Sequence, residues 1–262
     1  MGWRRRGDGQ CNAGGAKGCR LDRAAGNRRW GGDDFGTVCP QRESPLSTSL
    51  PGAPILSVRN PTAIARAVEL LQAGQIIIIP TDTVYGIAVL PDKTEAIAHL
   101  YEIRNREPEP ASPFLMARPE YLDVLARPTR AAQRLARAFW PGLLTLILPS
   151  NPHINPALRA SPVALRVPNF PMLLPLFDAV GGFLFATGAV CCGEGPAITA
   201  PEAAKLFGDE VSLILDGGRA PFGIPSTIVD CIPDPPEIRR RGLIPEEKIW
   251  EVVGITPPHE VA

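Results

Sequence analysis

Apolar residues recur at two different spacings along the chain from Asn60 onward. Residues three and four positions apart share one face of a helix, so this spacing predicts amphipathic helices. The predicted helices are Pro61–Ala73, Lys93–Ile103, Thr129–Trp140, Pro201–Phe207 and Pro245–Val253. Short apolar runs lie between them, and such runs are typical of strands in a sheet.

The run Ile76–Ile79 consists of four consecutive isoleucines, which predicts a strand over Gln75–Pro80 that is buried on both faces. Further strands are predicted over Thr145–Leu148, Val163–Val167, Phe183–Thr187, Val211–Leu215 and Ser226–Asp230. Since strands and helices alternate, the pattern favours an α/β sheet with helices on its faces.

The first 55 residues show no helical or strand period and are rich in Gly, Arg, Asp and Asn. Such a composition buries too little apolar surface to offset the entropy of ordering. We therefore predict a disordered extension over residues 1–55 and one folded domain over residues 60–252. A basic arm that contacts RNA is the functional alternative for this extension.

Composition excludes several classes of protein. The 27 Lys and Arg residues balance 27 Asp and Glu residues, which argues against a protein that coats nucleic acid or an anionic membrane. No apolar run approaches the roughly 18–20 residues needed to span a bilayer, and no secretory signal is evident, so a cytoplasmic location is expected. The six cysteines and three histidines lack ligand or disulfide spacing, so no protein metal site is expected.

Two hydroxyl side chains follow the isoleucine run, in the segment Pro80–Gly86. In an extended chain Thr81 and Thr83 point to one side and Asp82 to the other. The carboxyl end of a strand faces the crevice in which open α/β sheets bind ligands. The alternative is an ordinary exit from a strand, with hydroxyls that cap the turn.

Arginines stand at three places where a phosphate or carboxylate could bind. Arg104 and Arg106 follow a predicted helix and fit a phosphate clamp, or else they complement the helix dipole. Arg166 interrupts an apolar strand, where a buried charge needs an anionic ligand or a structural carboxylate. Residues 239–241 are three consecutive arginines, which form either a basic cluster at a site or a solvated turn.

Six short motifs occur in a fixed order between residues 60 and 250: PTDTVYG, WPGLLT, VALRVP, LDGG, PSTIVD and a final RRG. Together they resemble the YrdC-like domain of threonylcarbamoyl-AMP synthases. The resemblance implies a twisted open mixed sheet flanked by helices, with a concave central cavity. It also implies that L-threonine, bicarbonate and ATP form threonylcarbamoyl-AMP and pyrophosphate for the t6A modification of tRNA.

The resemblance implies a role for each matched residue. Thr81, Arg166 and Ser226 would bind threonine, and Arg104, Arg106, Gly188 and Arg240 would bind the nucleotide. Arg104 and Arg106 would also be the catalytic residues. Mg²⁺ would enter with ATP, and partners would include the proteins that transfer t6A and tRNA or double-stranded RNA.

Two segments depart from the family pattern. Arg104-Asn105-Arg106 stands where the family has Lys-x-Arg, and Gly188-Ala189-Val190 stands where it has Ser-x-Asn. The alternative function is therefore a catalytically weakened module that binds nucleotide or double-stranded RNA. A carbamoyl-phosphate-using relative, similar to part of the hydrogenase maturation factors, is disfavoured because their acylphosphatase and zinc-finger modules have no counterpart here.

Overall fold

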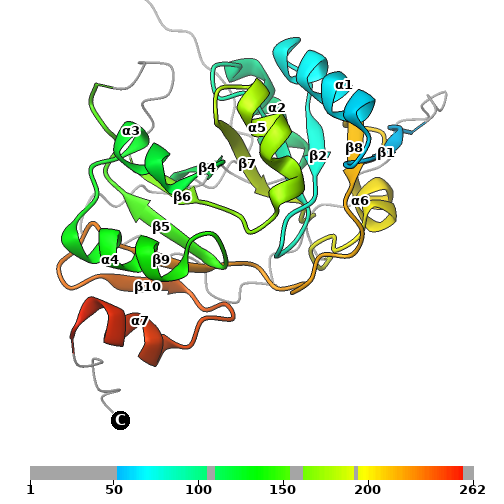
Figure 1. Cartoon of the computed structure of the whole chain (residues 1–262). Coiled ribbons are helices and arrows are strands. Elements are labelled where there is room, and N and C mark those ends of the chain that lie inside the picture. Colours follow the sequence, from blue (N-terminus) through cyan, green and yellow to red (C-terminus); the bar gives the residue numbers. More distant parts are fainter. Residues whose placement is uncertain (1–51, 105–109, 154–161, 192–193, 256–262) are drawn as a thin grey trace, which may run out of the picture.

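A single ten-stranded sheet runs through the part of the chain that the computed structural model describes, residues 52–104, 110–153, 162–191 and 194–255 (Figure 1). Its strands are β1 (Ile55–Ser57), β2 (Ile77–Ile79), β3 (Gly86–Val89), β4 (Ser112–Met116), β5 (Leu144–Leu148), β6 (Val163–Arg166), β7 (Phe183–Gly188), β8 (Leu213–Asp216), β9 (Thr227–Asp230) and β10 (Glu237–Arg240). They lie in the order β1-β8-β2-β3-β7-β4-β6-β5-β9-β10. Parallel and antiparallel neighbours both occur, so the predicted open mixed sheet is confirmed.

Helices cover both faces of the sheet (Figure 1). They are α1 (Pro61–Gln72), α2 (Thr94–Ile103), α3 (Leu122–Leu125), α4 (Arg130–Phe139), α5 (Leu174–Ala179), α6 (Ala200–Phe207) and α7 (Glu246–Val253). The helices α2, α3, α4, α6 and α7 pack into a first core, whereas α1 and α5 pack into a second core on the other face. The five predicted helices are confirmed, each to within one residue at either end.

Local sequence explains where α1 begins and ends. The side chain of Asn60 accepts a hydrogen bond of 3.0 Å from the backbone N–H of Thr62, which satisfies one donor of the first turn. Pro61 occupies the first helical position, where its missing N–H costs nothing. Gly74 adopts a φ of 76°, a left-handed conformation in which glycine is favoured and which turns the chain toward β2.

The isoleucine run at β2 separates the two cores. Side chains alternate along a strand, so Ile76 and Ile78 pack into the first core, while Ile77 and Ile79 pack into the second. All four are at most 4% exposed, which confirms a strand buried on both faces. Burying one isoleucine side chain contributes about 1.5–3 kcal/mol, so this strand stabilises both layers.

The structure also holds elements that the apolar pattern did not predict, namely β1, β3, β4, β10, α3 and α5. The strand β3 starts at Gly86, directly after the hydroxyl segment, and pairs antiparallel with β2. The strand β1 starts at Ile55, the last residue of the predicted extension. Residues 1–51 lie outside the described residues, so their disorder stays a prediction. Among the described residues, no helix is long and apolar enough to cross a membrane.

Candidate functional site

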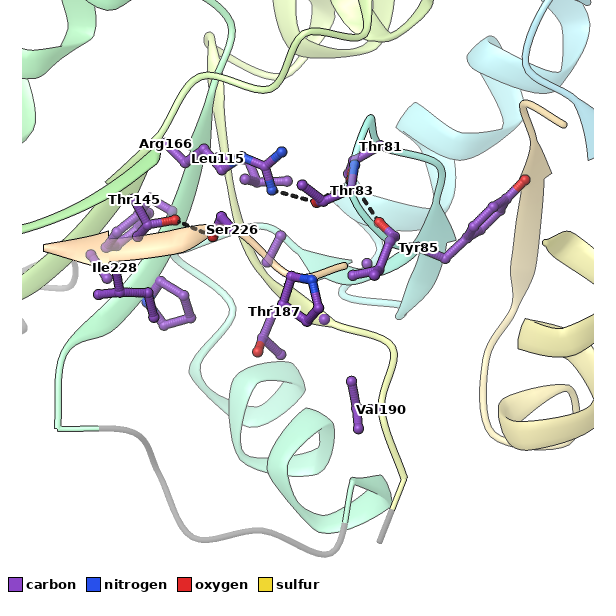
Figure 2. Close-up of a pocket in the computed structure, with 18 of the residues that line it drawn as sticks. Thr81, Thr83, Tyr85, Leu115, Thr145, Arg166, Thr187, Val190, Ser226 and Ile228 are labelled. Carbon is purple, nitrogen blue, oxygen red and sulfur yellow. Dashed lines mark hydrogen bonds between the residues drawn. The ribbon is translucent and has the colours of Figure 1, made fainter. Parts of the chain in front are cut away.

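A cavity opens on the sheet face opposite the first core, along β4, β6, β5 and β9 (Figure 2). Five of the side chains that line it alternate with residues of the first core, namely Leu115, Thr145, Ala164, Arg166 and Ile228. The second core stops near β4 and β7, and the cavity continues the same face beyond it. Its volume, including the mouth that is open to solvent, is about 810 Å³.

Six of the seven residues that the sequence singled out line this one cavity: Thr81, Arg104, Arg166, Gly188, Ser226 and Arg240. The seventh, Arg106, lies outside the described residues. Three guanidinium groups from α2, β6 and β10 therefore meet at one site. No Asp, Glu or Lys occurs among the described residues that line the cavity. The arrangement favours an anionic ligand that carries several negative charges.

The guanidinium of Arg166 is held on three sides. Its Nε donates to the carbonyl of Gly142 at 2.8 Å, Nη1 donates to Oγ1 of Thr83 at 2.6 Å, and Nη2 donates to Oδ1 of Asp82 at 2.5 Å. Burial lowers the pKa of Arg166 to about 10, against the opposing effect of Asp82. The group is therefore charged at neutral pH. These bonds use three of its five N–H groups, so one on each Nη remains for a ligand.

Asp82 is a structural carboxylate for the buried charge of Arg166, which was one of the two explanations that the sequence left open. The carboxyl is 2% exposed and forms an ion pair with Arg166. Burial raises its pKa, although the charge of Arg166 acts in the opposite direction. Asp82 is not among the cavity-lining residues, whereas Arg166 is. Arg166 therefore pairs with a structural carboxylate and also faces the cavity, where an anionic ligand can reach it.

A chain of hydroxyls leads away from Arg166. Oγ1 of Thr81 donates to the carbonyl of Val84 at 2.6 Å. A hydroxyl has one proton, so the proton in the 3.1 Å bond between Thr81 and Thr83 belongs to Thr83. Thr83 in turn accepts from Arg166 (Figure 2). Both threonine side chains line the cavity, as the alternation in the sequence predicted, and their orientations are fixed before a ligand arrives.

Ser226 is held by two neighbours across the sheet. Its Oγ lies 2.7 Å from Oγ1 of Thr145 (Figure 2) and accepts from Nη2 of Arg240 at 3.3 Å. Nε of Arg240 donates to the carbonyl of Ser226 at 3.0 Å. Thr145 was not among the predicted site residues, although its position at the end of the WPGLLT motif is a signal in the sequence.

The three consecutive arginines at β10 have three different surroundings. Arg240 lines the cavity. Arg239 pairs with Asp230 at 2.9 Å and with Glu237 at 2.9 Å, and Arg241 pairs with Glu246 at the surface. Arg241 follows the last residue of β10, and the pairing of β10 with β9 is irregular between Ile238 and Arg240, so the three side chains do not follow a regular strand alternation. The solvated alternative therefore applies to Arg241, whose side chain is 75% exposed, and not to Arg240.

Arg104 caps the C-terminal end of α2 and is 2% exposed. A cation there complements the helix dipole, and the same side chain lines the cavity. Arg104 can therefore complement the helix dipole and also bind a phosphate in the cavity. The neighbouring wall at residues 188–190 is different, because it presents Gly188 and the methyl groups of Val190. A Cβ at Gly188 would lie 3.5 Å from Val190 and 3.7 Å from Val84, which is ordinary van der Waals contact.

Comparison with known proteins identifies relatives of this chain. The family model named for Sua5, YciO and YrdC, described as "Telomere recombination", matches residues 69–242. The threonylcarbamoyl-AMP synthase of Bacillus subtilis is 34% identical over 203 residues, which are 76% of this chain and 58% of that protein. A putative threonylcarbamoyl-AMP synthase of Mycobacterium tuberculosis is 33% identical over 196 residues, which are 73% of this chain and 89% of that protein.

Solved structures give the same result. Sua5 of Pyrococcus abyssi, crystallised with L-threonine, superposes with a TM-score of 0.70 at 30% identity, over 78% of this chain and 63% of that one. YciO of Escherichia coli has a TM-score of 0.67 at 24% identity, which shows a shared fold. The chain spans somewhat more than half of the length of the synthases from B. subtilis and P. abyssi, at 58% and 56%. The chain belongs to the Sua5, YciO and YrdC family.

Proposed function

We propose that this chain is a threonylcarbamoyl-AMP synthase, a nucleotidyltransferase that makes threonylcarbamoyl-AMP and pyrophosphate from L-threonine, bicarbonate and ATP. One observation carries the proposal. Three guanidiniums and the hydroxyls of Thr81 and Ser226 line a single cavity that has no carboxylate among its described residues. The names of the relatives point to the same reaction.

Threonine would bind beside Arg166. The two N–H groups that Arg166 has left can hold a carboxylate in a bidentate bond, which is a strong and directional interaction. Thr81 lines the same cavity, and its hydroxyl donates to the carbonyl of Val84 and accepts from the hydroxyl and the backbone N–H of Thr83, so it would fix the wall against which threonine binds. The hydroxyl of Ser226, held by Thr145, would contact the same substrate.

The nucleotide would bind toward Arg104, Arg240 and Gly188, with Arg106 as a further cation. The amine of threonine takes up CO₂ from bicarbonate, with loss of water, to give a carbamate. An oxygen of the carbamate attacks the α-phosphorus of ATP, and the bond from that phosphorus to the bridging oxygen breaks as pyrophosphate leaves. Negative charge collects on the phosphate oxygens, and fixed guanidiniums stabilise it without reorganisation.

Magnesium fits this site only as part of the ATP complex. Mg²⁺ prefers carboxylate, phosphate and water oxygens, and the described lining residues offer no carboxylate. Within the described ranges no group of His, Cys, Asp or Glu is placed to hold a metal. The phosphates of ATP would therefore carry the ion. The product would serve the t6A modification of tRNA through transfer proteins in the cytoplasm.

The proposal is tested by incubating the purified full-length chain with L-threonine, bicarbonate, ATP and Mg²⁺ and measuring pyrophosphate. Release is expected only when all four are present, and mass spectrometry should detect threonylcarbamoyl-AMP. A well-folded protein that releases no pyrophosphate would contradict the proposal. In that case, salt-dependent binding of double-stranded RNA would identify the weakened module that the sequence left as an alternative.

A further inference from the structure

The buried carboxylate of Asp82 has a position that the proposed reaction does not explain. It lies behind the wall of the cavity, in contact with Nη2 of Arg166, and it does not line the cavity itself. Its second oxygen, Oδ2, is buried and has no hydrogen-bond partner among the described residues. A carboxylate that is taken out of water is costly unless a neighbouring cation compensates for it. Arg166 is the cation that compensates for the burial of Asp82, and the backbone N–H of Asn169 stabilises the carboxylate further.

We propose that Asp82 is a positioning residue, which sets the orientation of Arg166 toward the carboxylate of threonine. The ion pair at Nη2 and the bond from Nε to Gly142 fix two edges of the planar guanidinium. With Thr83 at Nη1, the plane cannot turn, and one N–H on each Nη stays available for a carboxylate. This inference rests on the proposed function, because it assumes that Arg166 binds threonine.

A second ion pair in the same chain provides a matched control. Arg239 and Asp230 form a pair at 2.9 Å, and Asp230 is 6% exposed. Neither residue lines the cavity. Loss of the Asp230 carboxylate removes an ion pair with a similarly buried carboxylate outside the cavity, although Arg239 keeps its second partner, Glu237. The two pairs therefore separate an effect on threonine binding from a general effect on the fold.

The experiment compares steady-state pyrophosphate release by the wild type, Asp82→Asn and Asp230→Asn. For Asp82→Asn we expect the KM for threonine to rise about tenfold or more, since a charged hydrogen bond contributes about a factor of ten or more in affinity. The KM for ATP should change by less than about twofold. For Asp230→Asn neither KM should change by more than about twofold, whatever happens to the melting temperature.

Two results would overturn the inference while the proposed function stands: an unchanged KM for threonine in Asp82→Asn, or an equal rise in both KM values. A wild type without threonine-dependent release would instead overturn the proposed function. If Asp82→Asn does not fold, Asp82→Glu keeps the charge and displaces it by one methylene. That variant should raise the KM for threonine at least threefold with the KM for ATP within about twofold, and an unchanged KM for threonine refutes the inference.

Discussion

The cavity has two walls that are built in different ways. The arginine wall, formed by Thr81, Thr83 and Arg166, consists of side chains that already hydrogen-bond to one another and, behind the wall, to Asp82 and the carbonyl of Gly142. The glycine wall, residues 188–190, is held by its backbone: the N–H of Ala189 donates to the carbonyl of Tyr85 at 2.8 Å. It offers the cavity a bare Cα and methyl groups.

This difference indicates that the site depends on fixed side-chain positions at the arginine wall more than at the glycine wall. Donors that are fixed before the ligand binds cost no reorganisation during the reaction, and the arginine wall has this property. The glycine wall leaves space where the resemblance noted in the sequence implies a hydroxyl and an amide. Substitutions in the arginine wall should therefore lower activity strongly, whereas substitutions in the glycine wall should change it little or improve it.

The largest effect is expected for Arg166→Lys. Lysine keeps the positive charge, but a point charge cannot bond to Gly142, Thr83 and Asp82 and also hold a carboxylate with two parallel bonds. Two charged hydrogen bonds of about 1.5–3 kcal/mol each correspond to a loss of roughly 100-fold to 10,000-fold in kcat/KM for threonine. The measurement is threonine-dependent pyrophosphate release, and a loss of less than fivefold would contradict the role of the arginine wall.

A smaller effect is expected for Arg240→Ala, which removes one guanidinium from the cavity. The KM for ATP should rise roughly tenfold to 100-fold, since one charged hydrogen bond contributes about 1.5–3 kcal/mol. The adjacent Arg241→Ala is the matched control, because this exposed residue pairs with Glu246 and does not line the cavity. Equal effects of the two variants on the KM for ATP would show that Arg240 has no special role.

Thr145→Val tests the support behind Ser226. The substitution keeps the shape of the side chain and removes its 2.7 Å bond to Ser226. A neutral hydrogen bond contributes about 1 kcal/mol, so kcat/KM for threonine should fall about fivefold while the protein remains folded. An unchanged kcat/KM would show that Arg240 alone is sufficient to orient Ser226.

The smallest effect is expected for Gly188→Ser, in the glycine wall. The cavity accepts a Cβ at this position without displacing its neighbours, and one added hydrogen bond of about 1 kcal/mol should lower the KM for ATP by roughly threefold to fivefold. Gly188→Ala is the control, since it adds the Cβ without the hydroxyl. A tenfold or greater loss of activity in Gly188→Ser would contradict the idea that this wall has free space.

Much of the fold could be predicted because the relevant signal is local. The isoleucine run reports burial on both faces, and Asn60, Pro61 and Gly74 mark the ends of α1. The helix α5 has six residues, too few to show a helical period. The strand β3 was missed because its apolar residues follow directly on the hydroxyl segment, which reads as a loop.

The candidate site was predictable residue by residue but not as a network. The motifs selected the arginines, and the alternation of Thr81, Asp82 and Thr83 gave the correct sides. What the sequence could not supply were pairings between distant positions. Asp82 and Arg166 are 84 positions apart, and Thr145 and Ser226 are 81 apart. Such pairs depend on the order of strands in the sheet, which local patterns do not encode.

The most direct test of the central claim is a crystal structure of this chain with L-threonine and a non-hydrolysable ATP analogue. The account predicts a threonine carboxylate at roughly 3 Å from both Nη atoms of Arg166, with the triphosphate between Arg104 and Arg240. Threonine bound away from Arg166, or a nucleotide bound outside this cavity, would contradict it.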